Sequence, residues 1–109
     1  MIINAETFRD RLVERLAPLK GRFRSVCGPG RSGAIASVYA SHFLRIPWLP
    51  YRRQIVPMLL QPTLIIDTAI MSGATLRKAT RKIIGPSETL ALFVEPPRVR
   101  FWYEVERYG

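Results

Sequence analysis

Residues 64–79 read Leu64-Ile65-Ile66-Asp67-Thr68-Ala69-Ile70-Met71-Ser72-Gly73-Ala74-Thr75-Leu76-Arg77-Lys78-Ala79. The first four are typical of a buried strand that ends on an acid, and the periodicity from Leu76 onward indicates a helix, so a tight loop joins the two. The first N–H groups of a helix lack partners within it and carry the positive end of its dipole. Small and hydroxyl residues let a phosphate approach those groups, and here they are Ser72, Gly73, Ala74 and Thr75. This stretch therefore predicts a phosphate-binding turn, with Asp67 facing the same crevice.

A second glycine-rich turn, Gly28-Pro29-Gly30-Arg31-Ser32-Gly33, lies between a short strand predicted over residues 23–27 and a helix predicted over about residues 34–43. Glycine permits positive φ and close backbone approach, and Arg31 adds a fixed cation that can bind phosphate through two hydrogen bonds. Either turn alone could be purely structural, because such sequences are also common turns and helix caps. Two of them in one small domain favour phosphate binding.

Together these two segments resemble the type I phosphoribosyltransferases. In that family an apolar strand, two acids, two apolar residues and a Thr/Ser-Gly-x-Thr turn bind phosphoribosyl pyrophosphate (PRPP). Residues 64–75 match this pattern, with Thr68 in place of the second acid. Residues 26–47 are similar to the family's pyrophosphate turn and the helix after it, with Arg31 and Gly33 at the Arg and Gly positions. The resemblance covers residues 26–94 and is that of a short, partly degenerate member.

The resemblance implies a fold and a role for each matched residue. The implied fold is α/β, a single phosphoribosyltransferase-like domain over residues 1–109 with a parallel sheet, helices on both faces and a reduced hood. The residues that would bind pyrophosphate are Gly30, Arg31, Ser32 and Gly33, and those that would hold the 5′-phosphate are Met71, Ser72, Gly73, Ala74 and Thr75. Asp67 would bind a ribose hydroxyl and the Mg²⁺ that accompanies PRPP, and the implied catalytic residues are Asp67, Thr68 and Arg31.

Two functions remain open. The resemblance implies transfer of phosphoribose from PRPP to a nucleobase. Three departures from the family pattern favour another reading: Thr68 replaces a carboxylate, Met71 stands where purine-salvage members have an acid that handles the base proton, and the loop that closes over the reacting centre is short or missing. The alternative is a non-catalytic relative that binds a nucleotide, or that uses its basic surface to bind RNA, DNA or a protein.

Charge and cysteine content narrow the classes of partner. Lys and Arg number 17 against 8 Asp and Glu, and the net charge of +9 favours anionic partners: phosphorylated metabolites, nucleic acid or an acidic protein. The single Cys27 excludes an internal disulfide and a cysteine-based zinc cluster. Catalysis by Cys27 is not expected either, because the only histidine, His42, lies a helix away.

The expected location is the cytoplasm, without a membrane partner. The amino terminus lacks the basic-then-apolar pattern of a secretory signal. The most apolar region, residues 55–76, is interrupted by Pro57, Pro62 and Asp67, so it does not predict a membrane-spanning helix.

Hydrophobic periodicity and alternation predict four further helices and strands. They are an amphipathic helix over residues 4–19, a helix over residues 76–84, a buried strand over residues 89–94 and a terminal strand over residues 99–105. The terminal strand would place Phe101 and Tyr103 on one face and Trp102 on the other. A small domain that is 48% hydrophobic and ends in aromatic residues leaves apolar surface uncovered. We therefore expect a two-fold homodimer, which is also the usual state in the family.

Overall fold

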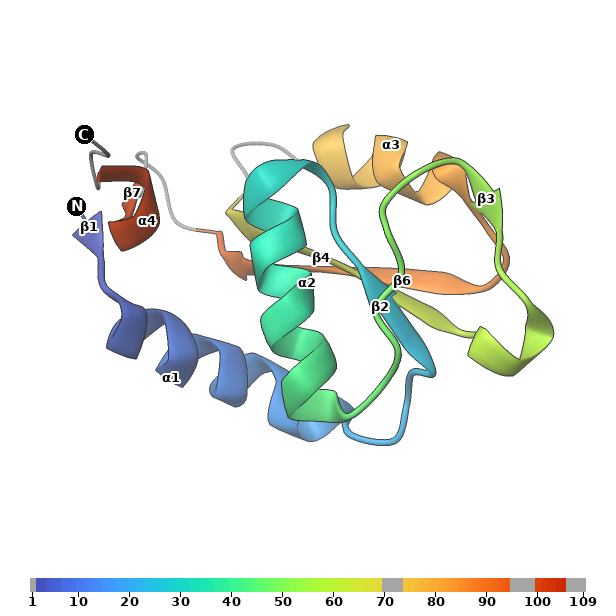
Figure 1. Cartoon of the computed structure of the whole chain (residues 1–109), viewed down its shortest axis with the longest axis horizontal. Helices are drawn as coiled ribbons and strands as arrows, with labels where there is room; N and C mark the ends of the chain where they lie inside the picture. Colours follow the sequence, from blue (N-terminus) through green and yellow to red (C-terminus); the bar gives the residue numbers. More distant parts are fainter. Residues whose placement is uncertain (1, 70–73, 95–99, 106–109) are drawn as a thin grey trace.

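The structure is a computed structural model that describes residues 2–69, 74–94 and 100–105 (Figure 1). Within these ranges, the side chains of residues 74–76, 100, 104 and 105 are not described. The predicted phosphate-turn residues Met71, Ser72 and Gly73 lie outside the described residues.

A parallel sheet of three strands forms the centre of the molecule. The strands are β2 (Ser25–Cys27), β4 (Thr63–Ala69) and β6 (Ser87–Phe93), in the order β2-β4-β6. Cys27 lies opposite Ile65, and Asp67 lies opposite Ala91. The middle strand β4 is the strand that the acid-ending stretch predicted, and it continues past Asp67 to Ala69. Its continuous apolar run suits a parallel strand that is covered on both faces.

Helices cover both faces of this sheet, as predicted. On one face α1 (Ala5–Leu16) and α2 (Gly30–Leu44) bury Phe8 and Ala36 against Leu64 and Ile66. On the other face α3 (Ala74–Lys82) packs Ala79 in a second cluster that contains Ile65. Because successive side chains of a strand point to opposite faces, neighbouring residues of β4 belong to different clusters. The predicted α/β fold with a parallel sheet is confirmed.

Both edges of the sheet have backbone groups that are engaged by other parts of the chain. Two arginines of α1 donate to carbonyl oxygens of the edge strand β6, Arg11 to Leu92 at 3.0 Å and Arg15 to Ala91 at 3.2 Å. On the other edge strand, β2, the N–H of Val26 donates to the Pro47 carbonyl at 3.0 Å, and its carbonyl accepts from the Leu49 N–H at 2.8 Å. These contacts tie α1 and the segment after α2 to the sheet.

Two helix boundaries differ from the prediction. α2 begins at Gly30 rather than near Ala34, because Pro29 stands at the N-cap position with an extended backbone and most of the glycine-rich turn is already helical. α3 ends at Lys82, two residues before the predicted end at residue 84, because the next two β-branched residues form β5 (Ile83–Ile84) beside β3 (Gln54–Ile55). The amphipathic helix over residues 4–19 is confirmed as α1 and the 3₁₀ turn η1 (Ala17–Leu19).

The terminal strand predicted over residues 99–105 is wrong. Of residues 100–105, which the structure describes, only β7 (Arg100–Phe101) is extended; it pairs with β1 (Ile2–Ile3), and α4 (Trp102–Val105) follows it. The Phe8 ring contacts both Phe101 and Trp102, with centroid separations of 6.0 and 5.4 Å. A strand would turn these adjacent side chains to opposite faces, so the shared contact needs the helical turn. We call β1, β7 and α4 the terminal unit; in it β1 near the start of the chain pairs with β7 near its other end (Figure 1). The reduced hood stays a prediction.

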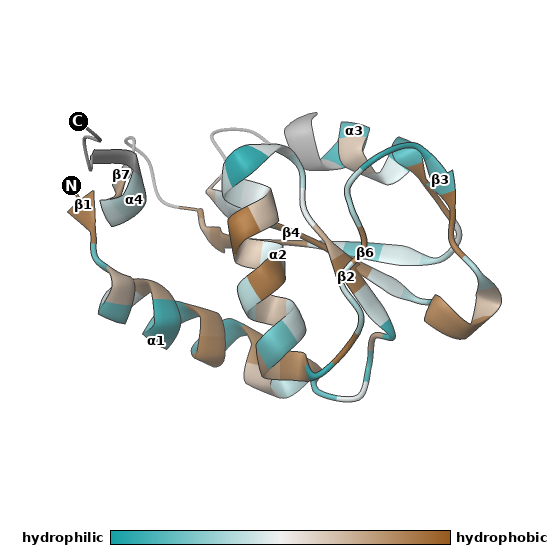
Figure 2. Cartoon of the chain, viewed as in Figure 1, coloured by the Kyte–Doolittle hydropathy of each residue, from teal (hydrophilic) through white to brown (hydrophobic). Residues whose placement is uncertain are grey.

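An apolar tip is exposed at the far end of the molecule from the terminal unit. It surrounds the 3₁₀ turn η2 (Met58–Leu60) and is brown in Figure 2. The exposed fractions of Ile55, Met58 and Leu59 are 76%, 84% and 82%. Uncovered apolar surface is thus present, while the homodimer stays a prediction. No helix in the described part of the chain has the length and apolar character needed to cross a membrane.

Candidate functional site

The turn after β2 and the carboxyl end of β4 lie in direct contact. A Cβ atom built on Gly28 would overlap the Gly33 carbonyl oxygen and stand 2.5 Å from the Ile66 carbonyl oxygen. A Cβ on Gly33 would stand 2.8 Å from the Gly28 carbonyl carbon. Only glycine fits at both positions, so the backbone of the turn packs directly on β4. This close approach brings the first turn of α2 to the carboxyl ends of the strands, where Asp67 also lies.

The predicted pyrophosphate residues do not all have the same environment. Gly33 is buried, and packing determines its position. Gly30 and Arg31 are exposed, and Gly30 has a φ of 67°. Pro29, at the N-cap position, supplies no side-chain hydrogen bond to the first N–H groups of α2. Those N–H groups and the Arg31 guanidinium together form the arrangement that binds anions at helix starts.

A hollow of about 370 Å³ opens beside this turn. It is lined by Arg31, Ser32, Ile35 and Tyr103. Its volume lies within the range of small-ligand pockets, about 300–1,000 Å³. The Tyr103 hydroxyl donates a hydrogen bond to Ser32 Oγ at 3.1 Å. Sequence reasoning missed this contact; the run of aromatic residues that ends at Tyr103 was the one signal that could have pointed to it.

Asp67 holds its carboxylate in a half-buried position two residues before the carboxyl end of β4. Burial raises the pKa of the Asp67 carboxyl, and hydrogen bonds from the backbone and side chain of Thr68 oppose that shift. The backbone hydrogen bond runs from the Thr68 N–H to Asp67 Oδ1 at 2.7 Å. Burial therefore disfavours the charged form, which a bound cation would favour. A carboxylate kept under such conditions beside an anion-binding turn is a functional candidate.

Thr68, which stands in place of the family's second acid, is buried next to Asp67 and contributes hydrogen bonds to its carboxyl. Its exposed fraction is 2%. An acid at residue 68 would have to be buried. Ala74 and Thr75, of the predicted 5′-phosphate turn, supply the first backbone positions of α3.

The residues present fit a Mg²⁺ ion that arrives with a phosphorylated ligand. Among the described residues there is no group of three or more His, Cys, Asp or Glu side chains that could hold a metal ion. Mg²⁺ commonly keeps several waters and uses one or two carboxylates together with substrate phosphates. Asp67 supplies such a carboxylate, and the missing ligands would come from water and the phosphates.

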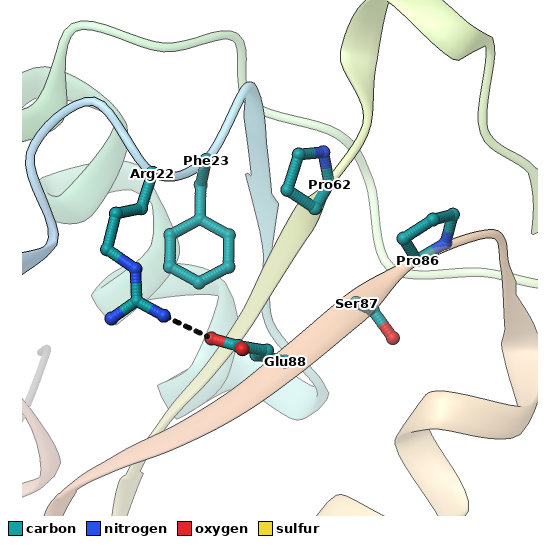
Figure 3. A pocket seen from close by; sticks show the side chains of 6 residues that line it. All are labelled: Arg22, Phe23, Pro62, Pro86, Ser87 and Glu88. Carbon is teal, nitrogen blue, oxygen red and sulfur yellow. Dashed lines mark ion pairs between the residues drawn. The ribbon is translucent and has the colours of Figure 1, made fainter.

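A second hollow lies at the other end of the sheet, where the strands begin (Figure 3). Its volume is about 290 Å³, and the residues that line it are Arg22, Phe23, Pro62, Pro86, Ser87 and Glu88. An ion pair of 3.5 Å joins Arg22 to Glu88 across it. Ligands of parallel α/β sheets bind at the carboxyl ends of the strands, so this hollow is not the candidate site.

Cys27 is unreactive by position. It is fully buried on the α3 face, whereas His42 is exposed on α2 on the other side of the sheet. Burial raises the pKa of the Cys27 thiol to about 11. These facts agree with the expectation that Cys27 is not a nucleophile.

We expect iodoacetamide at about pH 8 to leave Cys27 of the folded protein unmodified and to alkylate it fully in urea, because at that pH only about a thousandth of a thiol with this pKa is ionised. Mass spectrometry of the intact chain measures the added carbamidomethyl group. Equal rates of alkylation in the folded and unfolded protein would show that Cys27 is accessible.

The fold is that of the phosphoribosyltransferases. The structure is similar to Helicobacter pylori xanthine-guanine-hypoxanthine phosphoribosyltransferase, with a TM-score of 0.72 and 18% identity over 95% of this chain and 91% of that chain. It is also similar to a purine phosphoribosyltransferase from Pyrococcus horikoshii Ot3, with a TM-score of 0.63 and 13% identity over 99% of this chain and 95% of that chain. No family model matches the sequence, and no curated protein matches it. The likeness confirms the predicted type I phosphoribosyltransferase-like fold.

Proposed function

We propose that this protein binds PRPP at the carboxyl edge of its sheet and transfers the phosphoribosyl group to a nucleobase. The observation that carries the proposal is the direct contact of Gly28 with β4, which joins the uncapped first turn of α2 to the strand end that holds Asp67. PRPP needs a turn for its pyrophosphate, a carboxylate and a turn for its 5′-phosphate. The first two therefore meet at the carboxyl ends of the strands. Ala74 and Thr75, the last two residues of the proposed 5′-phosphate turn, begin α3, the helix that follows β4 in the chain.

Each group has a role in this proposal. Arg31 and the N–H groups of the first turn of α2 would bind the pyrophosphate and stabilise the negative charge that it gains on departure. Asp67 would accept a hydrogen bond from a ribose hydroxyl and hold the ring during transfer. Bound Mg²⁺ would neutralise part of the pyrophosphate charge. Interactions that strengthen as the pyrophosphate leaves lower the barrier to transfer.

A second candidate function is a non-catalytic relative that responds to a nucleotide and binds nucleic acid or protein. Its specific support is a basic surface on α3, where Arg77, Lys78, Arg81 and Lys82 are all exposed. Thr68, which is buried in place of a family acid, also favours this function. In either function we propose a homodimer, supported by the exposed apolar tip of Ile55, Met58 and Leu59.

Calorimetry tests the proposal. We expect PRPP with Mg²⁺ to bind, EDTA to remove that binding, and Arg31→Ala to weaken it by about tenfold or more because a charge-assisted contact to phosphate is lost. Arg24→Ala is the matched control: Arg24 is also exposed but precedes β2, at the opposite edge of the sheet, so it should leave the affinity unchanged.

Incubation with PRPP and each common nucleobase then measures nucleotide formation. Binding of a nucleoside monophosphate without any product would favour the non-catalytic function. Absence of binding by both PRPP and the monophosphate would contradict both functions at this site.

A further inference from the structure

One hydrogen bond connects the terminal unit to the proposed pyrophosphate turn. The Tyr103 hydroxyl on α4 donates to Ser32 Oγ at 3.1 Å, across a sequence separation of 71 residues. Ser32 lies in the first turn of α2, beside Arg31, and both line the hollow of about 370 Å³ that Tyr103 also borders. The two hydroxyl groups therefore meet at the wall of the space where pyrophosphate would bind.

Aromatic packing fixes the Tyr103 side chain. Its ring is stacked on Phe101, with centroids 5.5 Å apart and an interplanar angle of 10°. The Trp102 ring meets the Tyr103 ring edge-on, with centroids 5.0 Å apart, and it also contacts the Phe8 ring of α1, with centroids 5.4 Å apart. Phe8 and Phe101 are buried, so this cluster belongs to the core. The hydroxyl is thus presented by a rigid ring rather than by a freely rotating side chain.

The direction of the hydrogen bond determines what Ser32 can offer a ligand. A serine hydroxyl has one proton to donate and two lone pairs that accept. Because Ser32 Oγ accepts from Tyr103, its own proton remains available, and the accepted bond polarises it as a donor. The oxygens of an ionised pyrophosphate act as acceptors, so they match this donor.

We propose that Tyr103 is a positioning residue of the pyrophosphate site: it holds the Ser32 hydroxyl so that Ser32 donates to a pyrophosphate oxygen. This inference rests on the proposed function. It gives the terminal unit a role in ligand binding, because Phe8, Phe101 and Trp102 support the tyrosine that orients Ser32. It concerns the pyrophosphate alone, since the 5′-phosphate would bind at residues 71–75.

Titration of Mg²⁺-pyrophosphate into the Tyr103→Phe variant tests the proposal. We expect about fivefold weaker binding, the effect of one neutral hydrogen bond. Affinity for a nucleoside monophosphate should stay unchanged, whereas a general loss of structure would lower that affinity too. Tyr39→Phe is the matched control, because its ring also contacts Phe8, at 5.3 Å, but its hydroxyl is not the one that binds Ser32.

A double-mutant cycle with Ser32→Ala isolates the coupling. If Tyr103 acts through Ser32, then Tyr103→Phe has no further effect on pyrophosphate affinity once Ser32 is alanine. The positioning role would be overturned if Tyr103→Phe alone bound pyrophosphate as tightly as the wild type or more tightly. It would also be overturned if the losses of affinity from Tyr103→Phe and Ser32→Ala were additive. In either case, binding of PRPP by the wild-type protein would leave the proposed function standing. Absence of PRPP binding by the wild-type protein would overturn both.

Discussion

Asp67→Asn is expected to abolish Mg²⁺-dependent PRPP binding and to raise the thermal stability of the protein at neutral pH. The substitution removes the carboxylate that would hold the ribose hydroxyl and the ion, and the loss should weaken binding at least as much as loss of an outer-shell partner of a metal, which costs about 10–100-fold. The fold should persist, because the side-chain carbonyl of the introduced asparagine would still accept the hydrogen bond from the Thr68 N–H.

The stability change has a definite sign and pH dependence. Burial raises the pKa of Asp67 above its ordinary value of 3.8, so folding favours the protonated carboxyl over the charged one. The stability contributed by this preference is fully present below the ordinary pKa, and it is lost as the pH rises through the raised pKa. Asparagine carries no charge at any pH. The melting temperature of Asp67→Asn should therefore exceed that of the wild type at neutral pH, and the advantage should disappear in acid.

Calorimetric titration and thermal melts over a pH series measure the two effects separately. Glu88→Gln is the control, because Glu88 is an exposed carboxylate at the amino end of β6 that pairs with Arg22. It should leave PRPP affinity unchanged. If Asp67→Asn bound PRPP as tightly as the wild type, Asp67 would be a strand-end residue without a role in the ligand site.

Gly28→Ala is expected to cost about 3 kcal/mol of unfolding free energy, and the melting temperature should fall by about 10 °C or more. The added methyl group would overlap the Gly33 carbonyl oxygen and come within 2.5 Å of the Ile66 carbonyl oxygen. Both neighbours are backbone atoms of regular elements, so the clash can be relieved only by moving α2 away from β4. Because the same contact aligns the two halves of the proposed site, PRPP affinity should fall as well.

Gly30→Ala is the matched control in the same turn. Gly30 has a φ of 67°, but a Cβ atom there would meet nothing within 4 Å. The substitution should cost only the strain of a left-handed residue, about 1–2 kcal/mol. Chemical denaturation of both variants compares the two costs. A Gly28→Ala protein as stable as Gly30→Ala would mean that the turn can move off β4 easily.

The strand, turn and helix segments of the core could be predicted because their signals are local. The run of residues 64–67 and the periodicity of α1 each identify an element within one stretch of the chain. The glycines at residues 28 and 33 also marked the correct turn. What the sequence did not reveal is that these two glycines are required by contact with each other and with β4, since that contact is a property of the packed backbone.

The terminal unit shows what local signals cannot provide. α4 has four residues, so it is too short for helical periodicity to be visible, and it is held by Phe8 near the other end of the chain. The same limit hid the Tyr103 hydroxyl bond, whose partner lies 71 residues away. For Asp67 the sequence predicted the residue and its end of the sheet, while its partial burial, the burial of Thr68 and the hydrogen bonds between them needed the structure.

The engaged edges of the central sheet limit how copies of this protein can associate. Arg11 and Arg15 occupy carbonyl oxygens of β6, and the backbone of residues 47–49 engages Val26 on β2. An incoming strand from another copy would have to displace these groups before it could pair. These contacts cover part of each side of the central sheet, which disfavours pairing with a strand of another copy there and favours a symmetric assembly that forms through side chains. Helix α1 in this sense shields the sheet edge as well as packing against the core.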